Sequence, residues 1–234
     1  MEEPLAILFD IDGTLISTGG AGSRSWRWAF ERLFAVPADI ARFSEVGMTD
    51  PQVARSVFSA LLRRAPEDKE LGRLLAAYLD RLPTEVEGSA EYRILGGVEE
   101  LLPRLCRTGF LLGITTGTIE AAAHIKLARS DLNRFFCFGG YGSDSDDRAG
   151  LTGVAIQRAG RILGRPLDPR QVVVVGDTPL DIEAARSNGA ISVGVATGNY
   201  GEGELKEAGA DHVLASLGDP LPFASEWERV QGRS

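Results

Sequence analysis

Four consecutive valines, Val172–Val175, restrict the fold more than any other part of the sequence. Valine is branched at its β-carbon, which suits an extended strand. A fully apolar run without alternation predicts a strand that is buried on both faces, and such strands occur in parallel sheets covered by helices. The run therefore favours an α/β fold.

Strand and helix patterns alternate along the chain, as a parallel sheet requires. Apolar runs predict strands at 5–9, 111–115, 135–138, 172–175 and 191–195, with a short last one at 213–214. Helical patterns are expected at 98–107, 120–129, 150–163 and 180–187. Pro103 is expected to kink the first of these helices or to mark a late start. These elements predict a Rossmann-like parallel sheet core.

Residues 18–88 show helical patterns and no convincing strand. The spacing of Trp26, Phe30, Leu33 and Phe34 is that of one helix face, and such stripes indicate core packing. Asp50 is expected to cap a helix that has Pro51 at its first position. We therefore expect an inserted all-helical module at 18–88, within an α/β core made of residues 1–17 and 89–234.

The net charge and the cysteine content limit the kinds of molecule and compartment that suit this chain. The net charge of −8 argues against binding of nucleic acid and against an anionic membrane surface. A phosphate site would have to be a local exception, built from a metal, backbone N–H groups or a few cations. Cys106 and Cys137 lack metal-like or C-x-x-C spacing, and the N-terminus has no signal-like segment. We expect a cytoplasmic protein without a membrane span, and no oligomeric state is assigned.

Acids follow the predicted strands at the places where they end. Asp10 and Asp12 come directly after the first strand, and Asp177 and Asp181 follow the valine run. Sites in open α/β sheets lie at the carboxyl ends of strands. Alternation along a strand lets Asp10 and Asp12 point the same way, where a cation would relieve their repulsion. Ordinary turns and helix caps are the alternative explanation. Oxygen ligands of this kind suit Mg²⁺.

Three segments match motifs of a known family. Asp10-Ile11-Asp12-Gly13-Thr14-Leu15 resembles the first motif of the haloacid dehalogenase-like hydrolases. Gly113–Gly117 is similar to the second motif, and Gly176–Asp181 is similar to the fourth. Their order and the helical insert after the first motif also fit. The resemblance is strongest to the phosphoglycolate phosphatase-like branch with an α-helical cap.

The resemblance implies roles for individual residues. Asp10 would be the nucleophile, and Asp12 would be the general acid and then the general base. Thr116 would assist catalysis by holding phosphate oxygens together with the backbone N–H of Gly117. Mg²⁺ would be bound by Asp10, Asp177 and the carbonyl of Asp12, with Asp181 supporting the metal or its waters.

The third motif departs from the family pattern, which usually has a lysine. Arg148 is taken as the catalytic, phosphate-binding cation. Lys126 is the rival, and an exposed surface cation is the plainer interpretation of either residue. Thr49, at the start of a cap helix, resembles a cap-loop position that faces the substrate, although a simple capping turn would explain it equally well.

The resemblance therefore implies a Mg²⁺-dependent phosphatase acting on a small phosphorylated metabolite, with phosphoglycolate as the leading candidate. A phosphosugar mutase and a non-catalytic phospho-ligand-binding relative are the alternatives. Related mutases use a cap histidine, whereas His124 and His212 both lie outside residues 18–88. A dehalogenase would replace the second acid, but this chain has Asp12.

Overall fold

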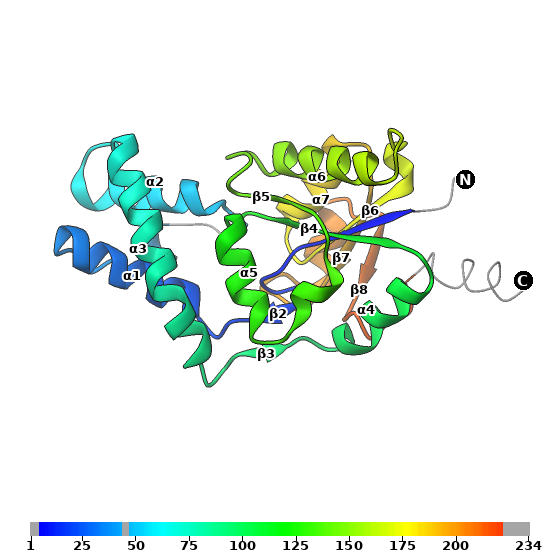
Figure 1. Cartoon of the computed structure of the whole chain (residues 1–234), viewed down its shortest axis with the longest axis horizontal. Coiled ribbons are helices and arrows are strands. Elements are labelled where there is room, and N and C mark those ends of the chain that lie inside the picture. Colours follow the sequence, from blue (N-terminus) through cyan, green and yellow to red (C-terminus); the bar gives the residue numbers. More distant parts are fainter. Residues whose placement is uncertain (1–4, 44–46, 222–234) are drawn as a thin grey trace, which may run out of the picture.

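A six-stranded sheet forms the centre of the computed structural model, which describes residues 5–43 and 47–221 (Figure 1). The strand order is β5-β4-β1-β6-β7-β8, and all neighbouring strands are parallel. The strands are β1 (Ala6–Phe9), β4 (Leu111–Thr116), β5 (Gly139–Tyr141), β6 (Val172–Gly176), β7 (Ile191–Val195) and β8 (His212–Leu214). The predicted parallel α/β sheet is confirmed.

Helices cover both faces of this sheet (Figure 1). One face is covered by α4 (Val98–Arg107) and α5 (Glu120–Ala128), and the other face is covered by α6 (Arg148–Ile162) and α7 (Pro179–Ser187). A last short helix, α8 (Glu202–Glu207), precedes β8. The valine run divides between two apolar cores: Val173 and Val175 face α4 and α5, and Val172 and Val174 face α6 and α7. Burial of β6 on both faces explains its unbroken apolar sequence.

The predicted helical segment forms a group of its own beside the sheet, next to α5 (Figure 1). It contains α1 (Ala21–Phe34), the short 3₁₀ turn η1 (Ile40–Arg42), α2 (Asp50–Leu62) and α3 (Asp68–Glu87). The apolar stripes of these helices pack together in one core, as predicted. The chain passes into and out of the group through β2 (Ile16–Ser17) and β3 (Arg93–Ile94), which pair antiparallel. The division at 18–88 lies beside this pair and stays a prediction.

One predicted strand was wrong. Residues 135–138 are not a strand, because the 3₁₀ turn η2 (Leu132–Phe135) occupies the start of this segment and β5 begins only at Gly139. β5 consists of two glycines and a tyrosine, so it has no apolar pattern to detect. A β-carbon at Gly140 would lie 1.9 Å from the carbonyl oxygen of Leu151 on α6, so this strand packs through bare backbone.

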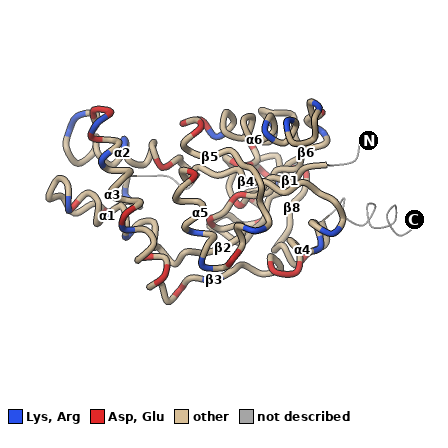
Figure 2. The backbone as a smooth tube through the Cα atoms, in the orientation of Figure 1, with Lys and Arg blue, Asp and Glu red and all other residues tan. Residues whose placement is uncertain are grey.

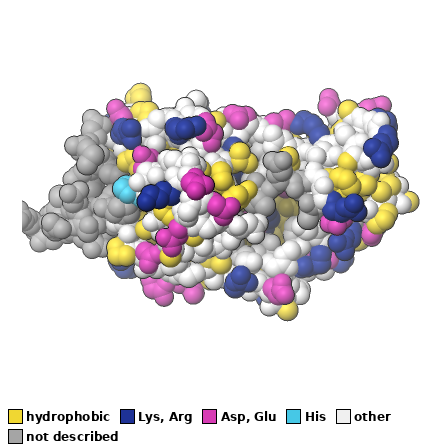
Figure 3. Space-filling view, turned by 180° about the vertical axis from the view of Figure 1, so that it is seen from behind, with side chains coloured by type: hydrophobic (Ala, Val, Ile, Leu, Met, Phe, Trp, Pro, Cys, Tyr) yellow, Lys and Arg dark blue, Asp and Glu magenta, His cyan; other side chains and the backbone are white. Residues whose placement is uncertain are grey.

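Other features refine the expectations. Pro103 lies inside α4, which begins at Val98, so it does not mark a late start. The turn η3 (Pro169–Gln171) leads directly into β6. Charged residues of both signs are spread along the chain (Figure 2) and mixed on the surface seen in Figure 3. Within the described ranges, each helix is too short or too polar to cross a membrane.

Candidate active site

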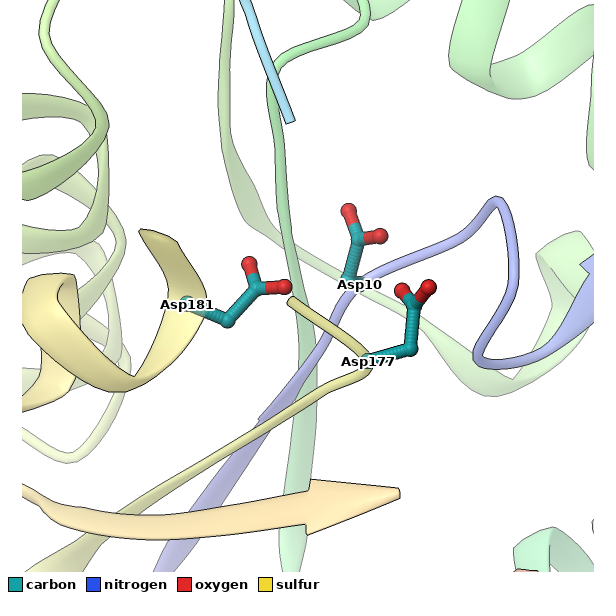
Figure 4. Close-up of side chains that lie close together, drawn as sticks. All are labelled: Asp10, Asp177 and Asp181. Atoms are coloured by element: carbon teal, nitrogen blue, oxygen red, sulfur yellow. The ribbon is translucent and has the colours of Figure 1, made fainter. Parts of the chain in front are cut away.

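Three carboxylates converge at the carboxyl ends of two neighbouring strands (Figure 4). Asp10 directly follows β1, Asp177 directly follows β6, and Asp181 lies in the first turn of α7. Because β1 and β6 are paired, their ends bring Asp10 and Asp177 side by side. One carboxylate oxygen from each of the three buried acids lies within 4.8 Å of the others. The structure thus brings together three of the four predicted acids.

Two glycines make room for the Asp177 carboxylate. A β-carbon at Gly13 would lie 2.4 Å from Asp177 Oδ2, and one at Gly198 would lie 1.7 Å from the same atom. Gly13 also has a φ of +86°, in the left-handed region that favours glycine. Thr14 Oγ1 donates a hydrogen bond of 3.2 Å to Asp177 Oδ1. A side chain at residue 13 or 198 would therefore push this carboxylate from its place.

Burial and mutual repulsion oppose ionisation of the cluster. Burial, followed by the charge of Asp10, raises the pKa of Asp177 to about 8. Burial also raises the pKa of Asp10 to about 6, although the Arg148 guanidinium opposes this rise. A divalent cation would relieve the repulsion between the carboxylates. Because all the donors are oxygens, the cluster fits Mg²⁺, the ion expected from the sequence.

Arg148 reaches this cluster from the first position of α6. Its guanidinium is buried, and Nη2 donates a 2.8 Å hydrogen bond to Asp10 Oδ1. Nε donates a 3.0 Å hydrogen bond to Asp181 Oδ1, and Nη2 contacts the same oxygen. Arg148 is therefore not an exposed surface cation. Its contact with Asp10 places a positive charge beside the expected nucleophile.

Asp12 is not one of the three converging acids, and its cationic partner differs from that of Asp10. The Oδ2 atom of Asp12 accepts a 2.5 Å hydrogen bond from Nζ of Lys126, which lies on α5, across the sheet from α6. The expected common orientation of Asp10 and Asp12 stays a prediction. Both acids lie beyond the end of β1 at Phe9, so strand alternation does not fix the direction of either side chain. The interpretation of Lys126 as a surface cation is wrong, because it is buried.

The remaining predicted residues meet next to this cluster. Thr116 is the buried last residue of β4, and Gly117 follows it. A β-carbon at Gly117 would lie 3.0 Å from Arg148 Nη1. The carbonyl oxygen of Gly117 accepts a 2.8 Å hydrogen bond from the backbone N–H of Asp50 at the start of α2. The cap residue of this helix is Thr49, whose Oγ1 accepts from the N–H of Gln52, so the prediction of Asp50 was wrong by one residue.

Two hydroxyl groups in the site were not predicted from the sequence. Thr14 binds Asp177, and Thr178 Oγ1 donates a 2.7 Å hydrogen bond to Asp181 Oδ2. Thr178 also accepts from the backbone N–H of Asp181, which makes the pair a capping box at the start of α7. The Thr-x-x-Asp spacing of Thr178 and Asp181 is a sequence signature of a capping box and could have predicted this pair. Each hydroxyl holds one carboxylate in a fixed orientation.

Comparisons with known proteins identify the family of this chain. The family profile of the haloacid dehalogenase-like hydrolases matches residues 4–189. A phosphoglycolate phosphatase from Rhodobacter capsulatus is 30% identical over 188 residues, which cover 79% of this chain and 80% of that protein. A 5′-nucleotidase from Pseudomonas aeruginosa is 28% identical over 217 residues, with 90% and 91% covered. The crystal structure of a hydrolase from Pseudomonas syringae has the same fold, with a TM-score of 0.72 at 24% identity and 95% and 98% covered.

The profile match runs through the helical insert and includes both strand ends that carry the acids, from Asp10 to Asp181. It covers most of the described sheet and both acids that accept hydrogen bonds from the Arg148 guanidinium. The chain therefore belongs to the haloacid dehalogenase-like hydrolases and is similar to their phosphoglycolate phosphatases.

Proposed function

We propose that the chain is a phosphatase that hydrolyses a small phosphate monoester through an aspartyl phosphate on Asp10. The observation that carries this proposal is the contact between Asp10 and the Arg148 guanidinium at the end of β1, beside two further buried acids. A carboxylate nucleophile next to fixed positive charge suits phosphoryl transfer, which depends on positioning and charge neutralisation.

The reaction takes two steps. An Asp10 carboxylate oxygen attacks phosphorus, the bond from phosphorus to the ester oxygen breaks, and Asp12 donates a proton to the leaving alcohol. Water then attacks the phosphorus of the aspartyl phosphate, Asp12 accepts a proton from that water, and Asp10 is released with inorganic phosphate. The hydroxyl of Thr116, the N–H of Gly117 and the guanidinium of Arg148 bind the phosphoryl oxygens.

Mg²⁺ is the proposed cofactor. Asp10, Asp177 and the backbone carbonyl of Asp12 would hold the ion, and Asp181 would support it. When bound, it neutralises charge on the transferring phosphoryl group. Arg148 contacts both Asp10 and Asp181, so it supplies a positive charge from the protein itself beside these acids.

Phosphoglycolate is the leading substrate, supported by the similarity to the Rhodobacter capsulatus enzyme. The mutase alternative has less support. His124 lies on α5 and His212 begins β8, so neither histidine belongs to helices α1–α3. A non-catalytic relative is the remaining alternative, and the presence of Asp10 speaks against it.

A panel of phosphorylated metabolites tests this function, with 2-phosphoglycolate, sugar phosphates and nucleoside monophosphates assayed for phosphate release with Mg²⁺. We expect Asp10→Asn to abolish release and a chelator to stop it until Mg²⁺ is restored. Asp131→Asn is the matched control, because Asp131 is an exposed acid at the start of η2. Substantial turnover by Asp10→Asn would exclude Asp10 as the nucleophile, and activity in chelator would exclude the metal.

A further inference from the structure

Lys126 is a buried cation that the proposed reaction leaves without a task. Its side chain is only 7% exposed. An ammonium group in the protein interior is costly unless it is paired and hydrogen-bonded. Nζ donates to Asp12 Oδ2 and, at 2.9 Å, to Thr118 Oγ1. Lys126 is therefore tied to the residue that is proposed to move the proton.

Two polar side chains of the insert, Asp50 and Tyr78, interact with the charge of this lysine, and Trp26 contacts both of them. Trp26 comes from α1, Asp50 from α2 and Tyr78 from α3. The buried Asp50 carboxylate accepts hydrogen bonds from the backbone N–H of Ile119, at 2.9 Å, and from the Trp26 side chain. The rings of Trp26 and Tyr78 stack with centroids 4.3 Å apart. These residues join the insert to the loop between β4 and α5.

The charge of Lys126 acts on the insert as well as on Asp12. Burial raises the pKa of Asp50, and the Lys126 ammonium opposes this rise. Burial likewise raises the pKa of Tyr78, with the charge of Asp50 adding to the rise and Lys126 opposing it. The ammonium thus interacts with one carboxylate from the core and one from the insert.

We propose that Lys126 is a positioning residue that fixes the Asp12 carboxylate and links its placement to the seating of the helical insert. The Asp12 side chain is 41% exposed, so a firm partner is needed to restrict its rotation. Only the Lys126 end of this ion pair is buried, and water screens a buried charge less than an exposed one, which strengthens its attraction to Asp12. This inference rests on the proposed function, in which Asp12 moves the proton.

The leaving group of the substrate provides the test. An alkyl phosphate, with 2-phosphoglycolate tried first, releases a basic alkoxide that needs a proton from Asp12. p-Nitrophenyl phosphate releases a stable anion that needs little protonation. We expect Lys126→Met to lower kcat/KM for the best alkyl phosphate by about 10- to 100-fold, and for the aryl phosphate by less than about threefold. Lys126→Arg should recover part of the loss, because it keeps the positive charge.

Arg129→Met is the matched control, because Arg129 is the residue that directly follows α5. Arg129 donates to the carbonyl oxygens of Val86 and Ser89, so its loss loosens the insert without touching Asp12. We expect this variant to change both substrates by the same factor. Asp50→Asn should also lower kcat/KM for the alkyl phosphate more than for the aryl phosphate, but by a smaller factor than Lys126→Met does. The melting temperature of each variant shows whether it is folded.

An equal loss for both substrates in Lys126→Met, or no loss for either, would overturn the positioning role. An equal loss in Asp50→Asn would overturn the link to the insert. These results are distinct from failure of the proposed function, which would appear as a wild-type protein without phosphatase activity or an active Asp10→Asn variant.

Discussion

The metal-free protein should lose stability as the pH rises from about 6 to about 7.5. Burial and repulsion raise the pKa of Asp177 to about 8 and that of Asp10 to about 6 in the folded state, against 3.8 for a free side chain. The folded protein therefore retains protons that the unfolded chain has already lost. A raised carboxyl pKa stabilises the fold at low pH, and this stabilisation disappears as the pH rises through the folded pKa.

The size of the effect follows from the number of protons retained. Each proton retained only by the folded state changes the free energy of unfolding by about 1.4 kcal/mol per pH unit. Asp177 retains nearly one proton over most of this interval, and Asp10 adds a fraction near its lower end. The free energy of unfolding should fall by about 2 kcal/mol, which lowers Tm by about 4–8 °C for a chain of this length.

Thermal unfolding in chelator, followed by circular dichroism at both pH values, measures this change. Asp177→Asn is the matched variant, because it removes the titrating group and nearly keeps its shape. The difference in slope between wild type and variant reports the contribution of Asp177, because every other titrating side chain is present in both proteins. Saturating Mg²⁺ should also flatten the wild-type slope, since a bound cation keeps the carboxylates ionised. Equal slopes for the two chelated proteins would refute the reasoning.

Two substitutions test the packing around the site. Gly198→Ala would place a β-carbon 1.7 Å from Asp177 Oδ2, so we expect the Mg²⁺ concentration for half-maximal activity to rise by about tenfold or more; an unchanged Mg²⁺ titration would contradict this. Thr49→Ala removes the capping box with Gln52, so urea unfolding should show a loss of about 1 kcal/mol. A Thr49→Ser control should retain most of this stability, and equal losses for both variants would assign the effect to packing.

The sequence predicted correctly those features that depend on a few neighbouring residues. The valine run correctly predicted a strand buried on both faces, because side chains from two cores alternate along β6. The acids after β1 and β6 meet because parallel strands end at the same edge of a sheet. Such features depend on a few neighbouring residues and on rules of sheet topology.

Other features depend on contacts between distant segments. Lys126 follows the helix pattern of an ordinary surface residue, and only the approach of α5 to the first strand end explains its burial. Asp50 likewise has the sequence signature of a capping residue, whereas the fold assigns its carboxylate to the N–H of Ile119. β5 was not predicted because its two glycines give no apolar pattern, although the lack of a side chain at Gly140 is what lets the strand pack closely against α6.

The antiparallel pair of β2 and β3 has a consequence for the evolution of this chain. In this pair, Ile16 lies opposite Ile94 and Ser17 lies opposite Arg93. The chain therefore leaves the sheet core along β2 and returns to it along the neighbouring strand β3. Neighbouring strands lie about 5 Å apart. A segment of any size can be inserted between β2 and β3 if its two ends lie about 5 Å apart. Such an insertion leaves the acids at the strand ends in place. The junction therefore allows the helical insert to be replaced without moving the strand ends that carry the acids.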